Sequence, residues 1–219
     1  MDIIVIQRAQ NLPTGRVFES DLSNMDNHQS QIETTPFMEG GQNQNMERVE
    51  QVDALATHQT VIGYTSQGLP FLLAARRLDA SHTAAFKFID QFVIPRLYFL
   101  AQKLSVSATP VDVIRDFIRE TDDLRINHAR TTEFTLALAL SYEKADGIRC
   151  AGFSIGDLGI VKRNAEGIIS QLAYGSEIAT AENVWLPDRF GTREDNAPDL
   201  KAIMNRNCIF TNIPVEPGC

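Results

Sequence analysis

The sequence predicts an α+β layered sandwich rather than a parallel α/β sheet. A β-rich hairpin pattern comes first, two helical segments follow it, and alternating strand patterns come after the helices. Strands that succeed one another through hairpins pair antiparallel, and helices pack across such sheets to form layers. The order of these patterns along the chain is therefore the main argument for the fold class.

The first part of the chain differs from the rest. Residues 1–46 begin with the strand-like run "DIIVI" and then become polar and rich in turn-forming residues. Neither a helical nor a strand period continues there, which is typical of a long loop or an extension. We therefore expect residues 1–46 to form an N-terminal strand and polar extension, and residues 47–219 to form the main domain.

The hairpin and the first helical segment follow. "TVIGYTSQGLPFLLAARRLD" contains two β-rich runs around the turn at Thr65–Gly68, which predicts a β-hairpin. From Thr83, "TAAFKFIDQFVIPRLYFLAQKL" keeps apolar residues at a spacing of about 3.6, as an amphipathic helix does. Pro95 lies inside this segment and is expected to kink or split the helix, because proline has no backbone N–H.

A second helix is predicted from its first residues. Thr109 is suited to the N-cap, Pro110 to the first helical position, and Asp112 to the positive end of the helix dipole. The period then changes to 2 in "EFTLALALSYE", and Asp146-Gly147 is a strong hairpin signal. Further strands are predicted in "IRCAGFSI", "LGIVKR", "IISQLAY" and "CIFTNIPV".

Composition excludes several classes of function. The net charge is −8 and no basic run is longer than a pair such as Arg76-Arg77, so nucleic-acid binding is not expected. No apolar run has the length of a membrane span, and the N-terminus does not have the pattern of a signal peptide. The expected location is the cytoplasm, with export by a specialised bacterial secretion system left open.

Common catalytic and zinc-binding patterns are not found in the sequence. The 3 cysteines form no C-x-x-C pair, and His28, His58 and His128 are isolated from one another. The chain has neither a G-x-S-x-G motif nor a phosphate-binding G-x-x-x-x-G-K-[ST] loop. Thiol, serine-triad and nucleotide-loop chemistries are therefore not predicted.

Three aspartates are the candidates for chemistry. Asp53, Asp79 and Asp157 each stand at a strand end or in a turn beside an apolar run. Magnesium and manganese prefer oxygen ligands, so acids presented at strand ends could hold such a cation. The alternative is that these residues only form turns, where aspartate is common.

Two basic residues lie beside these aspartates in the sequence. Arg48 precedes Asp53 by five residues and could hold a phosphate through its guanidinium, or it could be an ordinary surface residue. His82 follows Asp79 by three residues and could relay a proton, orient a ligand or cap a helix.

Several motifs together resemble a known family. "RVEQVDA" resembles R-x-x-N/M-E-D-A, "LDASH" resembles V-x-D-G-H-G-G, "RTTEFTLALAL" resembles the S-G-T-T-A strand, and "AGFSIGDLGIVKRNAEG" resembles A-N-x-G-D-S-R-x-x-L-x-R-x-G. The motifs occur in the family's order with the same elements between them. The stretch from Arg48 to Gly167 therefore resembles the metal-dependent protein phosphatases of type 2C.

The resemblance implies a fold and a mechanism. The fold is a four-layer αββα sandwich, and the reaction is phosphoester hydrolysis by a water that bridges two Mg²⁺ or Mn²⁺ ions. Asp53 and Asp79 would be the core metal ligands, and Arg48 would hold the phosphate. Ala80 would offer its backbone carbonyl to a metal, and Asp157 would lie beside the metals and serve a third ion. The implied substrate is a phosphorylated or similarly modified protein, including one that carries AMP.

The sequence also departs from the family pattern. Val52 replaces the glutamate before the first aspartate, and Ala80-Ser81 replaces Gly-His, with His82 displaced by one position. Asp188 and Asp195 are the candidates for one late acid, and the strand that should carry the other is not reached before Cys219. We therefore expect a C-terminally incomplete relative. The alternative function is an inactive pseudophosphatase that acts as a binding or regulatory module.

Overall fold

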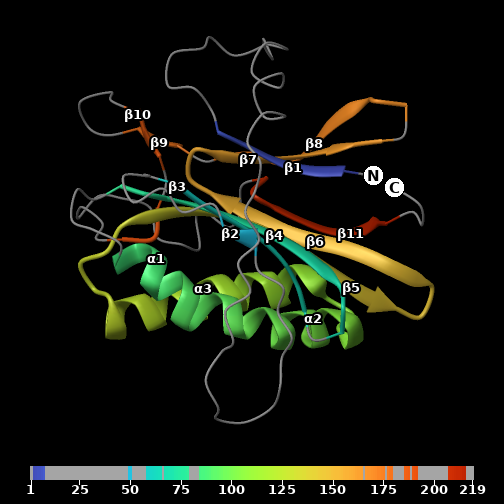
Figure 1. Ribbon diagram of the computed structural model, residues 1–219, viewed down its shortest axis with the longest axis horizontal. Coiled ribbons are helices and arrows are strands. Elements are labelled where there is room, and N and C mark those ends of the chain that lie inside the picture. The colour runs from blue at the N-terminus through green and yellow to red at the C-terminus, as the bar shows by residue number, and fades with distance from the viewer. Residues whose placement is uncertain are drawn as a thin grey trace.

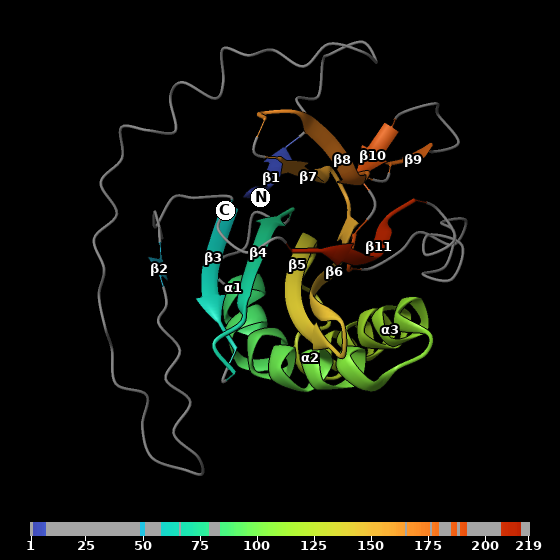
Figure 2. The ribbon, with the colours of Figure 1, turned by 90° about the vertical axis from the view of Figure 1, so that its right-hand side faces the viewer.

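The computed structural model describes residues 2–7, 49–50, 58–65, 67–78, 84–164, 166–175, 177–179, 185–187, 189–191 and 207–215. These residues form an α+β fold in which helices cover one face of a large sheet and a smaller sheet covers the other (Figure 1, Figure 2). The predicted α+β class with antiparallel sheets is therefore confirmed.

The large sheet has six strands in the order β11-β6-β5-β4-β3-β2, and every neighbouring pair is antiparallel. One hairpin joins β3 to β4 and another joins β5 to β6, as the turn residues predict. Gly68 (φ 75°) lies in the β3–β4 turn, and Gly147 (φ 128°) follows the two-residue loop of the β5–β6 hairpin. The strands are β2 (Val49–Glu50), β3 (His58–Tyr64), β4 (Pro70–Arg77), β5 (Phe134–Lys144), β6 (Gly147–Ile155) and β11 (Ile209–Pro214).

The helical layer contains α1 (Ala84–Phe88), a π-helix (η3, Ile89–Val93), a 3₁₀-helix (η4, Ile94–Arg96), α2 (Leu97–Val106) and α3 (Pro110–His128). The predicted interruption at Pro95 is confirmed, since this residue lies in η4 between the π-helix and α2. Thr109 occupies the predicted N-cap position of α3, although its side chain makes no capping hydrogen bond. In the described part of the chain, no helix is long and apolar enough to cross a membrane.

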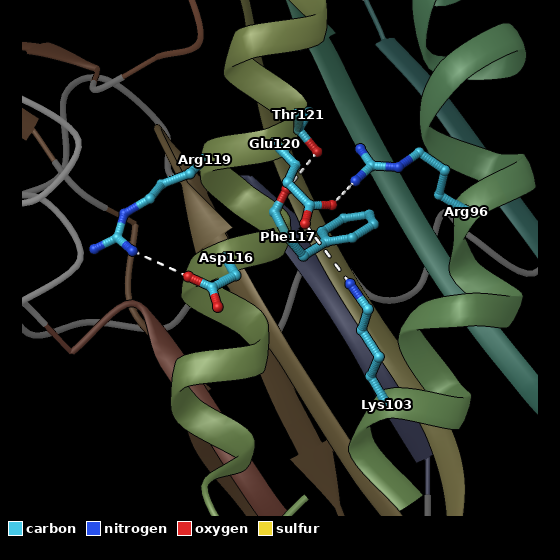
Figure 3. A network of polar contacts seen from close by, with 7 residues as sticks. All are labelled: Arg96, Lys103, Asp116, Phe117, Arg119, Glu120 and Thr121. Carbon is cyan, nitrogen blue, oxygen red and sulfur yellow. Dashed lines mark hydrogen bonds and ion pairs between the residues drawn. The ribbon is translucent and has the colours of Figure 1, made fainter.

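Apolar packing holds α2 and α3 to the sheet, and ion pairs add little. Glu120 of α3 accepts a hydrogen bond from Arg96 of η4 and forms an ion pair with Lys103 of α2 (Figure 3). The Cζ atom of Arg96 lies 5.2 Å from the ring centre of Phe117. Glu120 is 45% exposed, so water screens these pairs and each contributes less than about 1 kcal/mol. The apolar contacts come from buried residues that face the sheet: Leu97, Leu100, Leu104, Ile114 and Ile118.

The second sheet has the order β1-β7-β8 and lies on the face of the large sheet opposite the helices (Figure 2). Its strands are β1 (Asp2–Gln7), β7 (Leu158–Arg163) and β8 (Ile169–Ala173). Side chains alternate along β5, so that Leu136 and Leu138 face the helices while Ala137 and Ala139 face β7 and β8. A separate pair of short strands is formed by β9 (Glu177–Ala179) and β10 (Trp185–Pro187).

The N-terminal strand predicted in "DIIVI" is confirmed. β1 pairs antiparallel with β7 along its whole length, from Asp2 opposite Arg163 to Gln7 opposite Leu158. The segment Asp2–Gln7 is therefore part of the second sheet. The division between an extension at 1–46 and a domain at 47–219 stays a prediction, since residues 8–48 lie outside the described part of the chain.

The predicted fourth layer is not found among the described residues. An αββα sandwich needs a second helix pair against β1, β7 and β8, and every described element after β8 is a strand. The described residues thus give a helix layer and two sheets, which is the coarser part of the predicted architecture.

Candidate functional site

Several strand termini meet at one end of the large sheet. In the register of the sheet, His58 at the start of β3 lies opposite Arg76 near the end of β4, and Arg76 lies opposite Thr135 near the start of β5. β6 ends beside them, with Ile155 opposite Leu136. We call the place where these strand ends meet the Arg76 end of the sheet.

A buried carboxylate lies at this end, at the rim of the interface between the two sheets. Asp157 is 4% exposed and follows Gly156, whose φ of 109° makes the turn from β6 into β7. Arg76 donates a hydrogen bond from Nη1 to Asp157 Oδ2, and the fully buried Thr135 donates from Oγ1 to Asp157 Oδ1 at 3.1 Å. We call Arg76, Thr135 and Asp157 the Arg76 cluster. A carboxylate buried to this degree is stable only with such partners.

A second chain segment is attached at the same end. Phe190 forms an isolated antiparallel bridge with Phe134, the first residue of β5, and the two rings stack with centres 5.1 Å apart. Next to it, Arg189 forms an ion pair with Glu133, with 3.1 Å between Nε and Oε2. Residues 189–191 are thus held against the start of β5.

The buried Arg125 of α3 also holds this segment. Its Nη2 donates to the carbonyl of Gly191 at 3.3 Å, Nη1 donates to the carbonyl of Arg130 at 3.0 Å, and Nε donates to Asp122 at 2.9 Å. The backbone N–H of Leu78 also donates to the carbonyl of Glu133 at 2.9 Å. The chain leaving β4 and the segment 189–191 are therefore both anchored beside β5.

Most of the predicted site residues lie outside the described residues. These are Arg48, Asp53, Asp79 and Ala80, together with the weaker candidates His82, Asp188 and Asp195. Asp157 is described, and the structure brings it to Arg76 and Thr135. The roles predicted for all of these residues stay predictions.

Sequence reasoning missed Arg76 and Thr135. In the sequence, Arg76 is visible only as half of a basic pair, and Thr135 only as a polar residue of the alternating run "EFTLALALSYE". The available signal was the period of the strands: Arg76 shares a face of β4 with Ala74, and Thr135 shares a face of β5 with Ala137, and both faces pack toward the second sheet. A charged residue on an inward face needs a partner of opposite charge.

The metal ligation predicted for Asp157 is not tested by its contacts. Within the described ranges, no group of three or more His, Cys, Asp or Glu side chains could hold a metal ion. Both oxygens of Asp157 are bonded within the Arg76 cluster. The described residues therefore do not complete a cation site.

Cys150 is not a candidate nucleophile. Its thiol is buried in β6, and burial raises its pKa from 9.0 to about 12, so the reactive thiolate is not formed near neutral pH. The folded protein keeps this proton between about pH 9 and 12 while the unfolded chain loses it. This group therefore favours unfolding increasingly as the pH rises through that range.

We expect Cys150 in the folded protein to resist labelling by a thiol reagent such as DTNB at pH 8, and to react fully in urea. The expected effect is a labelling rate at least about 100-fold lower than that of the Cys150 thiol in the unfolded chain, because both access and ionisation are suppressed. The rate is measured by mass spectrometry of the Cys150 peptide. Labelling at the unfolded rate would contradict the buried position of the thiol.

These features define an α+β domain in which the Arg76 cluster, charged and hydrogen-bonded, lies at one end of the strands, where several chain segments meet. A family model described as the catalytic domain of SidD matches residues 3–219. The chain therefore belongs to the SidD catalytic domain family, and SidD is a Legionella effector deAMPylase. A comparison with curated proteins found no match.

Membership of this family corrects the resemblance to the type 2C phosphatases, which was wrong. The motifs behind it were short and incomplete, with Val52, Ala80 and Leu158 at positions where the type 2C pattern has other residues. Acids at strand ends are common in turns, so a few of them in order do not separate one family from another. The chain is a hydrolase that acts on a protein modification, and a serine/threonine phosphatase activity is not supported.

Proposed function

We propose that this protein is a deAMPylase, which hydrolyses the phosphodiester that joins AMP to a side-chain hydroxyl of another protein. Water attacks the phosphorus, the bond between phosphorus and the side-chain oxygen breaks, and that oxygen takes up a proton. The products are AMP and the restored hydroxyl. The match of the SidD catalytic domain to residues 3–219 is the observation that carries this proposal.

The structure supports a site at the Arg76 end of the sheet. β4 ends there, and Leu78, the residue before Asp79 in the sequence, is bonded to Glu133. β2 runs toward the same end, because Val49 pairs with Ile62 and Glu50 pairs with Val61, one step nearer to His58. The chain continues from Glu50 to Asp53 in the sequence.

We assign proposed roles accordingly. Arg48 binds the phosphoryl group, and Asp53 and Asp79, with the carbonyl of Ala80, hold a divalent cation. Oxygen ligands of this kind suit Mg²⁺ or Mn²⁺, which would neutralise negative charge on the phosphoryl oxygens.

The test is a comparison of substrates with the purified protein. A protein carrying AMP on a tyrosine or threonine is incubated with the chain, released AMP is measured by chromatography, and the restored hydroxyl is detected by mass spectrometry. A phosphoprotein and p-nitrophenyl phosphate serve as the comparison substrates. AMP release supports the proposal. Release of inorganic phosphate from the comparison substrates alone would replace it with a phosphatase, and no hydrolysis by folded protein would leave a binding or regulatory module.

Activity is expected to depend on a divalent cation. After dialysis against EDTA, hydrolysis of the AMP-modified protein should fall at least about 100-fold, and Mn²⁺ or Mg²⁺ should restore it. The reason is that a cation that polarises a phosphoryl oxygen lowers the activation barrier by several kcal/mol. The melting temperature should also rise when Mn²⁺ is added back, since an ion that binds only the folded chain stabilises it. Full activity in EDTA would contradict the requirement.

The proposed partner is thus an AMP-modified protein. Export by a specialised bacterial secretion system, as for SidD-like effectors, is the proposed route. A fusion to a translocation reporter measures it: reporter signal in the recipient cell supports the route, and signal confined to the producing cell would exclude it.

A further inference from the structure

We propose that Arg76 binds the phosphodiester anion of the AMP-modified side chain, and that Asp157 and Thr135 are positioning residues that orient its guanidinium. This inference rests on the proposed function. It extends that function to Arg76 and Thr135, to which neither the sequence motifs nor the family match assigns a role, and it gives Asp157 a positioning role.

The first argument is the geometry of the guanidinium. Its five N–H donors lie in one plane, and Nη1 donates to Asp157. The Arg76 side chain is 19% exposed, so part of it reaches the protein surface. The donors that are not directed at Asp157 can form bidentate hydrogen bonds with the two non-bridging oxygens of a phosphodiester. Arginine matches this geometry well.

The second argument is the way in which Asp157 is held. Thr135 is fully buried and bonds the carboxylate oxygen that Arg76 does not use, which prevents the carboxylate from rotating. Gly156 and the start of β7 fix the backbone on either side of Asp157. A guanidinium held by such a carboxylate is already oriented before the substrate arrives, and preoriented donors stabilise anions most effectively.

The third argument is energetic. The interface between the sheets beside the Arg76 cluster is made of apolar residues such as Ala74, Ala137 and Leu158. Replacing a buried ion pair with apolar residues of similar volume is often neutral or stabilising, so packing alone does not require charges at this position. A role in binding accounts for their presence.

Arg77 provides a contrast within the same strand. It carries the same charge as Arg76 and is also partly buried, and it lies opposite Phe134, on the face of β4 that packs toward the helices. Only Arg76 has its side chain on the side where Asp157 and the second sheet lie. The pair therefore separates the effect of position from the effect of positive charge.

The experiment measures hydrolysis of the AMP-modified protein and inhibition by free AMP, with Arg76→Met and Arg77→Met as a matched pair. For Arg76→Met we expect KM and the inhibition constant of AMP to rise together by about 10-fold or more, which is the usual loss when a charged hydrogen-bond partner is removed. For Arg77→Met we expect both constants to stay within about 2-fold of the wild type. Arg76→Lys should recover part of the loss, because lysine keeps the charge without the planar fork.

Thr135→Val tests the positioning role, because valine has the same shape without the hydroxyl. We expect a smaller rise in both constants, of about 3-fold, with kcat little changed. Titration calorimetry with AMP gives an independent measure of binding for each variant. A Thr135→Val protein that melts at a lower temperature and binds AMP as the wild type does would show that Thr135 has a structural role only.

Arg76→Met leaves the Asp157 carboxylate buried without the positive charge of the guanidinium, which could prevent folding. The double variant Arg76→Met/Asp157→Asn removes that charge and is measured alongside. If either folded variant binds AMP and its modified substrate as tightly as the wild type does, the role of Arg76 is refuted while the deAMPylase activity stands. If the wild type releases no AMP, the proposed function fails and the role of Arg76 fails with it.

Discussion

Replacing Asp79 with asparagine is expected to reduce hydrolysis of an AMP-modified protein by at least about 100-fold. The proposed function places this carboxylate where the chain leaves β4, one residue after Leu78, whose backbone is bonded to Glu133. Asparagine has the same shape and lacks the negative charge, so the variant tests charge at the site without creating a void. Losses of about 10²–10³ are usual when one electrostatic group of a hydrolytic site is removed. The measurement is kcat from AMP release under saturating substrate.

Asp146→Asn is the matched control. Asp146 lies in the exposed turn between β5 and β6 and pairs with Arg149, which lowers the pKa of its carboxyl below the usual value. Its side chain is 68% exposed and it belongs to neither the Arg76 cluster nor the proposed ligands, so kcat should change by less than about 2-fold. If Asp79→Asn retains the activity of this control while both variants melt at the wild-type temperature, Asp79 has no part in the reaction.

Gly152→Ala is expected to destabilise the protein severely, by more than about 3 kcal/mol. A Cβ at this position in β6 would lie 1.9 Å from the carbonyl oxygen of Leu138 and 2.9 Å from its carbonyl carbon. It would also lie 2.9 Å from an edge carbon of the Phe210 ring. Leu138 belongs to the adjacent central strand β5, and its backbone cannot move away without breaking the hydrogen bonds between β5 and its neighbours. The free energy of unfolding is measured by urea titration followed by circular dichroism.

Gly68→Ala separates this steric clash from the general cost of replacing a glycine. Gly68 has a φ of 75°, which alanine rarely adopts, and no atom lies within 4 Å of the position its Cβ would occupy. We expect this variant to lose only about 1–2 kcal/mol, the cost of the left-handed conformation. If Gly152→Ala proved no less stable than Gly68→Ala, that result would contradict the close approach of β6 to β5 at position 152.

Elements with strong local signals were predicted well. The hairpins follow from turn residues, the change of period from 3.6 to 2 marks where helices give way to strands, and Pro95 interrupts a helix because it lacks a hydrogen-bond donor. These features depend on interactions between residues close in sequence. They are therefore readable without knowledge of the fold.

The family was not predicted correctly from short motifs. Asp53 and Asp79 stand beside apolar runs, and such positions are occupied by aspartate in many unrelated proteins. A family model weighs the whole of residues 3–219 at once, and it identified the SidD catalytic domain where a few short motifs had suggested type 2C phosphatases. The coarser prediction, a hydrolase that acts on a modified protein, is confirmed.

By itself, the sequence determined the order of helices and strands, the antiparallel class of the sheets and the position of the turns. Only the tertiary structure decided that β1 pairs with β7, a strand far from it in the sequence, and that Asp157 meets Arg76 and Thr135. Arg76 and Asp157 are 81 positions apart, so no local pattern connects them. Their contact arises because the register of β4, β5 and β6 brings these strand ends together at one end of the sheet. A buried carboxylate there requires a positively charged side chain as its partner.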